Sequence, residues 1–224
     1  MYPEVLSGIT VSGVYIHEPG GLITDMMIAV LCLGLLLNLS APKDAFQKYW
    51  ALFIAMVGLA GLGGALVHGF PTVLGEELFY WMWGLKNVFL PIGNYFASFV
   101  ILKSLFPSKM YFLKPILIVK MVAINVIMFI SYSFLPIVMD IGITYILVIW
   151  LSGRLILDIK AYSAIRNAFL VAFFSGFLYI FQYDIDPVWF SHKDLVHVFV
   201  LISVYLIYRA IKIRNEDYSF GRVG

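Results

Sequence analysis

Seven long, nearly continuous apolar stretches make up most of the chain. A helix needs about 20 residues to cross the hydrocarbon core of a bilayer, and none of the stretches shows the strict alternation of a barrel strand. The pattern predicts an all-α fold, a polytopic membrane protein built as a bundle of seven transmembrane helices. The stretches are Gly21–Leu39, Tyr49–Phe70, Leu78–Leu105, Pro115–Phe134, Ile137–Leu151, Ala161–Gln182 and Leu195–Ile211.

Two stretches depart from the usual length. Leu78–Leu105 exceeds what a bilayer requires, so this helix should tilt, or kink at Pro91 or Gly93. Ile137–Leu151 is short and is expected to extend toward Arg154.

The composition agrees with a membrane protein and leaves no room for a second domain. Of the 224 residues, 62% are hydrophobic and 12% are charged, whereas a soluble domain carries about 25% charged residues. We therefore expect residues 1–224 to form a single membrane domain. The basic residues do not gather into a patch, and no nucleic-acid partner is expected.

The charged residues of the connections predict the orientation, because cytoplasmic loops collect Lys and Arg. Alternate connections, Pro71–Glu77, Leu135–Asp140 and Tyr183–Phe190, contain no basic residue. The N terminus is therefore expected outside, with residues 1–20 extracytoplasmic, and residues 213–224 are expected to form a cytoplasmic tail. The basic residues of the other connections and the tail are Lys43, Lys48, Lys103, Lys109, Lys114, Arg154, Lys160, Arg166, Arg209, Lys212, Arg214 and Arg222.

This orientation brings the four histidines to one depth. His17, His68, His192 and His197 all fall at the outer side of the predicted bundle. Asp25 lies a few residues inside the outer end of the first helix. An ionisable residue within a span is costly and usually marks a site. Lys86, in the third helix, is a possible counter-ion for Asp25, whereas Lys120 can snorkel toward the cytoplasmic side and is given no role.

Two interpretations of the histidines stand side by side. A histidine near a membrane interface often only reaches headgroups or water with its ring nitrogens. Three imidazoles with an open fourth position are instead typical of catalytic zinc, and His68, His192 and His197 are the candidate ligands. His192 and His197 are five residues apart, so they converge only if His192 lies in the first turn of its helix.

Asp194 also has two interpretations. Ser191 fits an N-cap position, and an acid three residues later suits the positive end of the helix dipole. Asp194 and His197 are three residues apart and share a helix face, which favours a role near the site. Asp25 and Asp194 are therefore the candidate acid–base residues.

Two short segments resemble a known superfamily. Gly61-Leu62-Gly63-Gly64-Ala65-Leu66-Val67-His68 resembles the second-helix motif of alkaline ceramidases. His192-Lys193-Asp194-Leu195-Val196-His197-Val198-Phe199 resembles the seventh-helix histidine motif shared by ceramidases and the progestin and adipoQ receptors. These proteins belong to the CREST superfamily of seven-helix membrane hydrolases. The resemblance implies zinc held by His68, His192 and His197, and the N-out arrangement also occurs in ceramidases.

The chain differs from the superfamily at three points. Gly64 stands where the family has a serine, and the third-helix aspartate falls near Phe79, with only Glu76 and Glu77 close by. The seventh-helix histidines are four apart in the family and five apart here. The resemblance therefore indicates a divergent, bacterial branch in the inner (cytoplasmic) membrane, in which Asp25 or Asp194 replaces the missing acid.

Three functions follow as hypotheses. The first is a zinc-dependent hydrolase that cleaves an amide or ester of a membrane lipid at outer-leaflet depth, with Asp25 or Asp194 moving the proton. The second is a non-catalytic subunit of a larger membrane protein complex. The third is a b-type haem protein, with His68 and His197 as axial ligands. The Gly58, Gly61, Gly63 and Gly64 series is expected to allow close helix packing.

Overall fold

The computed structural model describes residues 8–155 and 160–219, and seven long helices account for most of them. All seven are long and apolar enough to cross a membrane, which confirms the predicted fold class of an integral membrane helix bundle. The helices are α1 (Pro19–Leu37), α2 (Ala45–Gly69), α3 (Pro71–Leu105), α4 (Met110–Ser131), α5 (Leu135–Gly153), α6 (Lys160–Phe181) and α7 (His192–Ser219).

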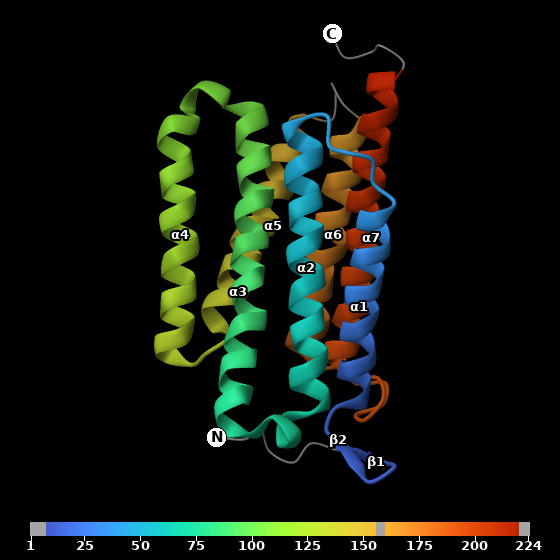
Figure 1. Cartoon of the computed structure of the whole chain (residues 1–224). Coiled ribbons are helices and arrows are strands. Elements are labelled where there is room, and N and C mark those ends of the chain that lie inside the picture. Colours follow the sequence, from blue (N-terminus) through green and yellow to red (C-terminus); the bar gives the residue numbers. More distant parts are fainter. Residues whose placement is uncertain (1–7, 156–159, 220–224) are drawn as a thin grey trace.

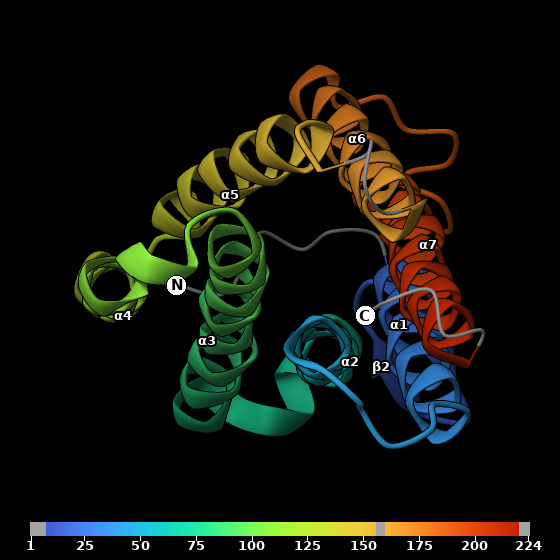
Figure 2. The same ribbon diagram turned by 90° about the horizontal axis from the view of Figure 1, so that it is seen from above.

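Six of the helices form a closed ring, and the seventh lies outside it. In the order α1, α2, α3, α5, α6 and α7, each helix packs against the next, and α7 returns to α1. The view from above shows α4 beyond α3 and α5, at the edge of the molecule (Figure 2). The first and last helices of the chain are thus neighbours, which brings Asp25 and His197 to the same part of the bundle.

The largest buried cluster of apolar side chains fills the ring on the side of the α2 N terminus. Trp50 and Phe53 of α2 pack edge-on or tilted against Phe169 of α6, and Tyr145 of α5 contacts the same ring. Ile207 and Ile211 of α7 complete the cluster. This packing fixes α2, α5, α6 and α7 relative to one another and leaves the other end of the ring for polar residues.

The glycines of α2 allow it to approach its neighbours closely, as the sequence predicted. A Cβ atom at Gly58 would lie 2.7 Å from Cβ of Cys32, and one at Gly61 would lie 2.9 Å from the carbonyl oxygen of Asp25, both on α1. At Gly63 the Cβ would lie 2.7 Å from Cβ of Lys86 on α3. Side chains at these positions would push the helices apart.

A short β-hairpin closes one end of the bundle, which we call the hairpin end. Strands β1 (Ile9–Val11) and β2 (Val14–Ile16) pair antiparallel. The backbone amide of His17 then donates to the carbonyl of Gly69, and that of Glu18 donates to the carbonyl of His68, both at 3.1 Å. The segment before α1 is therefore bound to the C-terminal end of α2. Figure 1 places the hairpin at the end opposite the C terminus.

The connection between α2 and α3 is shorter than the sequence predicted. Phe70 alone separates the two helices, and helix α3 begins at Pro71, so the expected connection Pro71–Glu77 is mostly helical. The helical backbone of α3 breaks at Gly75, where φ is +71°. Gly75 is the position inside α3 where φ and ψ are non-helical, and a glycine adopts this left-handed conformation without steric cost.

Two further boundaries differ from the prediction. Helix α5 begins at Leu135, so Asp140 lies inside a membrane-spanning helix and not in a connection. Helix α7 continues to Ser219, so much of the segment 213–224 expected as a tail is helical. Residues 1–7 of the expected outer segment and 220–224 of the tail lie outside the described residues.

Candidate functional site

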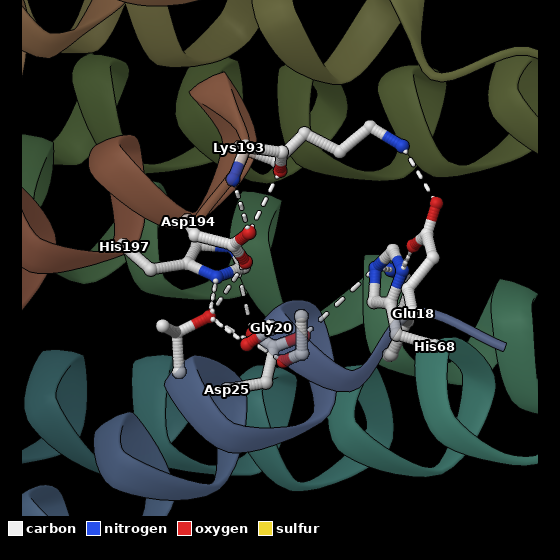
Figure 3. Close-up of polar contacts among 11 residues, drawn as sticks. Glu18, Gly20, Asp25, His68, Lys193, Asp194 and His197 are labelled. Atoms are coloured by element: carbon white, nitrogen blue, oxygen red, sulfur yellow. Dashed lines mark hydrogen bonds and ion pairs between the residues drawn. The ribbon is translucent and has the colours of Figure 1, made fainter. Parts of the chain in front are cut away.

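A small polar pocket lies at the hairpin end, between α1, α2 and the start of α7. Figure 3 shows its charged and imidazole side chains, which come from segments far apart in the sequence. Among the candidate residues, the structure brings His68, Asp194 and His197 to the walls of this pocket, and Asp25 lies against both histidines. The lining residues are Glu18, Gly21, His68, Pro187, Val188, Ser191, Lys193, Asp194 and His197.

Asp25 is the buried centre of the site, with 6% of the residue exposed. Its Oδ2 lies 3.8 Å from Nε2 of His68, and its Oδ1 lies 3.6 Å from Nε2 of His197. The carboxylate fits against α2 only because Gly64 has no side chain: a Cβ there would collide with Oδ2 of Asp25. The space of a side chain at Gly64 is thus filled by a carboxylate from α1.

Each histidine is held on its other ring nitrogen by a second residue. Nδ1 of His68 is hydrogen-bonded to Oε2 of Glu18, and Nδ1 of His197 lies 2.8 Å from the hydroxyl oxygen of Thr24. These contacts turn both Nε2 atoms toward Asp25. A histidine that binds a metal is usually oriented in this way, by a carboxylate or another acceptor on its second nitrogen.

Two lysines reach the same site. Nζ of Lys193 donates to Oε1 of Glu18 at 3.0 Å, and Nζ of Lys86 lies 3.2 Å from Nε2 of His68. Burial disfavours the charged form of Glu18, but the hydrogen bond and charge of His68 together with Lys193 outweigh it and lower the pKa of this carboxyl to about 2. Glu18 is therefore an anion at neutral pH and a fixed partner for His68.

Asp194 acts mainly as a cap of α7. Its Oδ2 accepts from both the backbone amide and the hydroxyl of Ser191, each at 2.8 Å, and its Oδ1 accepts from Thr24 at 3.1 Å. The carboxylate has several donors and points at the α1–α7 contact. This arrangement favours the capping interpretation of Asp194, with a secondary role of positioning Thr24 beside His197.

His192 is oriented away from the other two histidines. Its Nδ1 lies 2.8 Å from Oδ1 of Asp184, and its ring meets the ring of Tyr179 on α6 edge-on. The backbone amide of His192 also donates to Asp184, and these bonds lower the pKa of the Asp184 carboxyl. The five-residue spacing from His197 explains the separation, since such residues point to different sides of a helix.

The side chains around Asp25 do not form a ready-made zinc site in the described part of the chain. Among the described residues, no three His, Cys, Asp or Glu side chains stand together in ready ligand positions. The two Nε2–Oδ separations of 3.6 and 3.8 Å exceed a hydrogen bond, yet they are close to the roughly 3.4 Å that separates two ligands of a tetrahedral zinc. To hold an ion, His68, His197 and Asp25 would have to move closer together, and Lys86 would have to leave Nε2 of His68.

Three members of the site were not predicted from the sequence. Glu18 is hydrogen-bonded to His68, and Thr24 is hydrogen-bonded to His197. Lys193 donates to Glu18. Glu18 had a signal, because it is an acid at the predicted depth of the histidines. Thr24 had none, since a hydroxyl in an apolar helix usually bonds its own backbone.

The fold and the site together define an integral membrane protein of seven helices with a polar pocket at one end. Residues 21–216 match a family of unknown function, DUF6962, and the chain belongs to this family. The match begins next to the pocket in α1 and includes every helix. No curated protein matches the chain.

Proposed function

We propose that the protein is a metal-dependent membrane hydrolase, with zinc as the metal and an amide or ester of a membrane lipid as the substrate. One observation carries the proposal: His68 and His197 both turn Nε2 toward Asp25, and both are oriented through Nδ1 by a second residue. Two imidazoles and one carboxylate are a donor set of catalytic zinc enzymes.

Each side chain of the pocket has a distinct task in this proposal. His68, His197 and one oxygen of Asp25 would hold a zinc ion, which would supply Lewis-acid chemistry at the carbonyl of the scissile bond. The second oxygen of Asp25 accepts a proton from the attacking water and returns it to the leaving group. The ammonium of Lys86, close to His68, stabilises negative charge on the carbonyl oxygen.

The location of the pocket supports a lipid substrate taken from the outer leaflet. The basic connections lie at the end of the bundle away from the hairpin, and cytoplasmic loops collect such residues. At the hairpin end, the charge of Lys193 is balanced by its ion pair with Glu18. Lys193 therefore does not count as an unpaired basic residue when the loops of the two ends are compared. We therefore infer that the hairpin end faces outward, in the orientation proposed from the sequence and consistent with a bacterial inner membrane.

Metal analysis of purified protein tests the metal site. We expect about one zinc per chain in the wild type and a loss of zinc in His68→Ala and in His197→Ala. His192→Ala is the matched control, because His192 bonds Asp184 and not the pocket residues, and it should keep the metal. Wild-type protein without zinc, or equal zinc in His68→Ala and His192→Ala, would contradict the proposal.

A second candidate, a non-catalytic polar network, is favoured by one contact. Nζ of Lys86 lies 3.2 Å from Nε2 of His68, so the ammonium already occupies the side of the ring that a metal would need. In this case the pocket would hold α1, α2 and α3 together, as in a structural subunit of a membrane protein complex. The two candidate functions predict different effects of a substitution at Asp25.

The change Asp25→Asn separates them. In the hydrolase, Asp25→Asn keeps the shape of the site, weakens zinc binding because a carboxylate ligand is lost, and lowers turnover of a short-chain fluorogenic amide or ester by about 10²–10⁴-fold. In the structural network, Asp25→Asn leaves Lys86 without a buried anion and lowers thermal stability. The double change Asp25→Asn with Lys86→Met should then recover much of that stability. Melting curves and zinc content of the same samples decide between the two.

A further inference from the structure

A second polar cluster lies within the membrane-spanning part of the bundle, apart from the pocket at the hairpin end. Nζ of Lys120, in the middle of α4, lies 2.6 Å from Oδ1 of Asp140 on α5. Asn94 of α3 donates to Oδ2 of Asp140 at 2.7 Å, and Nζ of Lys120 also donates to the hydroxyl of Thr144 at 3.3 Å. Three helices thus meet at one carboxylate, whose side chain is fully buried.

An ion pair at this depth has two common uses. It can attach one helix to its neighbours, or it can bind a transported ion or proton, since intramembrane acids and amines often mark such routes. Attachment alone explains the Lys120–Asp140 contact, because α4 lies outside the ring. It does not explain the unpaired polar atoms of α3 and α4 that lie toward the hairpin end.

Two amide side chains with buried, unpaired atoms continue the polar cluster toward the hairpin end. Asn87 lies on the same face of α3 as Asn94, two turns nearer the hairpin end, with 2% of the residue exposed. Its Nδ2 has no hydrogen-bond partner in the described part of the chain, and neither has Oδ1 of Asn125 on α4. Asn125 is likewise nearer the hairpin end than Lys120.

An orphaned donor and an orphaned acceptor are costly in hydrocarbon, where no lipid group satisfies them. Water satisfies both, because buried waters typically bridge otherwise unpaired polar groups. The orphaned atoms lie on the hairpin-end side of the ion pair, on α3 and α4, which pack against each other. Water molecules at these positions would connect the hairpin end of the bundle to Asp140.

We propose that the Lys120–Asp140 pair is a proton-binding site within the membrane, reached by water along Asn87 and Asn125. A proton that arrives binds a carboxylate oxygen of Asp140 and converts it to a neutral acid. Lys120 keeps its own charge and loses its ion-pair partner. α4 is then held less tightly, because the pair is its main polar contact with α5. This inference does not depend on the hydrolase.

No other charged group shares this environment among the described contacts. The groups that touch the pair are the amide of Asn94 from α3 and the hydroxyl of Thr144 from α5. Tyr145, the other titratable residue of α5, packs its ring against Phe169 of α6. The carboxylate of Asp140 is therefore the proton acceptor of the cluster in this proposal.

Infrared difference spectroscopy of the full chain in lipid vesicles tests the proposal. As the pH falls, the wild type should gain a protonated-carboxyl absorption that is lost in the double variant Asp140→Asn with Lys120→Met. This variant carries no unpaired buried charge, so it should fold. An identical carboxyl titration in the two proteins would overturn the proposal and leave the pair as a fixed attachment of α4.

The water route is tested separately by hydrogen–deuterium exchange of the carboxyl proton, followed through the same infrared absorption. Asn87→Leu removes one water-binding group and should slow the exchange while leaving the absorption in place. Asn38→Leu, an exposed change at the opposite end of the bundle, is the control and should leave the exchange unchanged. Equal exchange in the wild type and Asn87→Leu would overturn the route from the hairpin end.

Discussion

Asp25 and Gly64 depend on each other at the level of single residues. The carboxylate of Asp25 lies where a side chain at Gly64 would stand, and this contact places the acid between the two histidines. A new side chain would have to displace either the carboxylate or the helix. Both are held by other contacts, so neither can move without a loss elsewhere.

We therefore expect Gly64→Ala to lower the free energy of unfolding by about 1–3 kcal/mol, as overpacking of a close contact does. Gly142→Ala is the matched control, since a Cβ at Gly142 meets nothing within 4 Å, and it should be neutral or slightly stabilising. Thermal melts in detergent compare the two. Equal melting temperatures would show that the α1–α2 contact is looser than described.

Glu18 makes the stability of the site dependent on pH. Its pKa falls from an ordinary value of 4.5 to about 2 in the folded chain. A group with a lowered pKa contributes stability that is fully present above its unfolded pKa and is lost as the pH falls toward its folded pKa. Melting temperature should therefore decline between about pH 4.5 and pH 2 more steeply in the wild type than in Glu18→Gln. Parallel curves would contradict the pairing of Glu18 with His68.

Single residues show where sequence reasoning reached its limit. Asp25, His68 and His197 were predicted, because polar residues in apolar helices stand out and helix direction gives their depth. The orientation of His192 was not predicted, because it depends on Asp184 in the preceding loop. Whether three histidines converge depends on helix rotation, which follows from packing and is not visible in a pattern of residue types.

Among the helices, α4 is the one with the least burial. Only Leu117 and Met128 of this helix are buried, so its place beside α3 and α5 depends strongly on Lys120 and Asp140. From the sequence alone, Lys120 was given no role, and Asp140 was expected in the connection before the fifth helix. Their contact joins two different helices, and hydropathy along one helix carries no information about it.

Removing one partner of this pair should be more harmful than removing both. Lys120→Met leaves Asp140 charged and buried, and we expect it to lower the free energy of unfolding by about 3–5 kcal/mol. Adding Asp140→Asn removes the buried charge and keeps a partner for Asn94, so much of the loss should be recovered. Chemical unfolding of the wild type, single and double variants measures this coupling. Additive losses would mean that the two side chains do not interact.

The positions of the helices were largely predictable. Hydropathy places the start or end of most helices within a few residues, because lipid requires a long apolar segment with internally bonded backbone. The β-hairpin of β1 and β2 was missed, since its strands have three residues each. The long α3 was expected to tilt, or to kink at Pro91 or Gly93, and the break at Gly75 was not predicted.

At the scale of the whole molecule, the orientation in the membrane is a proposal that a reporter can test. A reporter that is active only in the cytoplasm should be active when fused after Gly224 and silent when inserted at Gly75. Gly75 lies in the helix break at the hairpin end, so an insertion there disturbs the bundle least. The reverse pattern would place the pocket on the cytoplasmic side and exclude an outer-leaflet substrate.

The neighbouring positions of α1 and α7 have a consequence for the synthesis of the protein. Ribosomes make α1 and α2 first, so Asp25 and His68 enter the membrane long before His197 exists. The pocket can form only when the last helix has been inserted beside the first. A chain that stops before α7 therefore holds Asp25 and His68 but lacks His197, and its site is incomplete. Assembly of the complete site is therefore tied to insertion of the last helix.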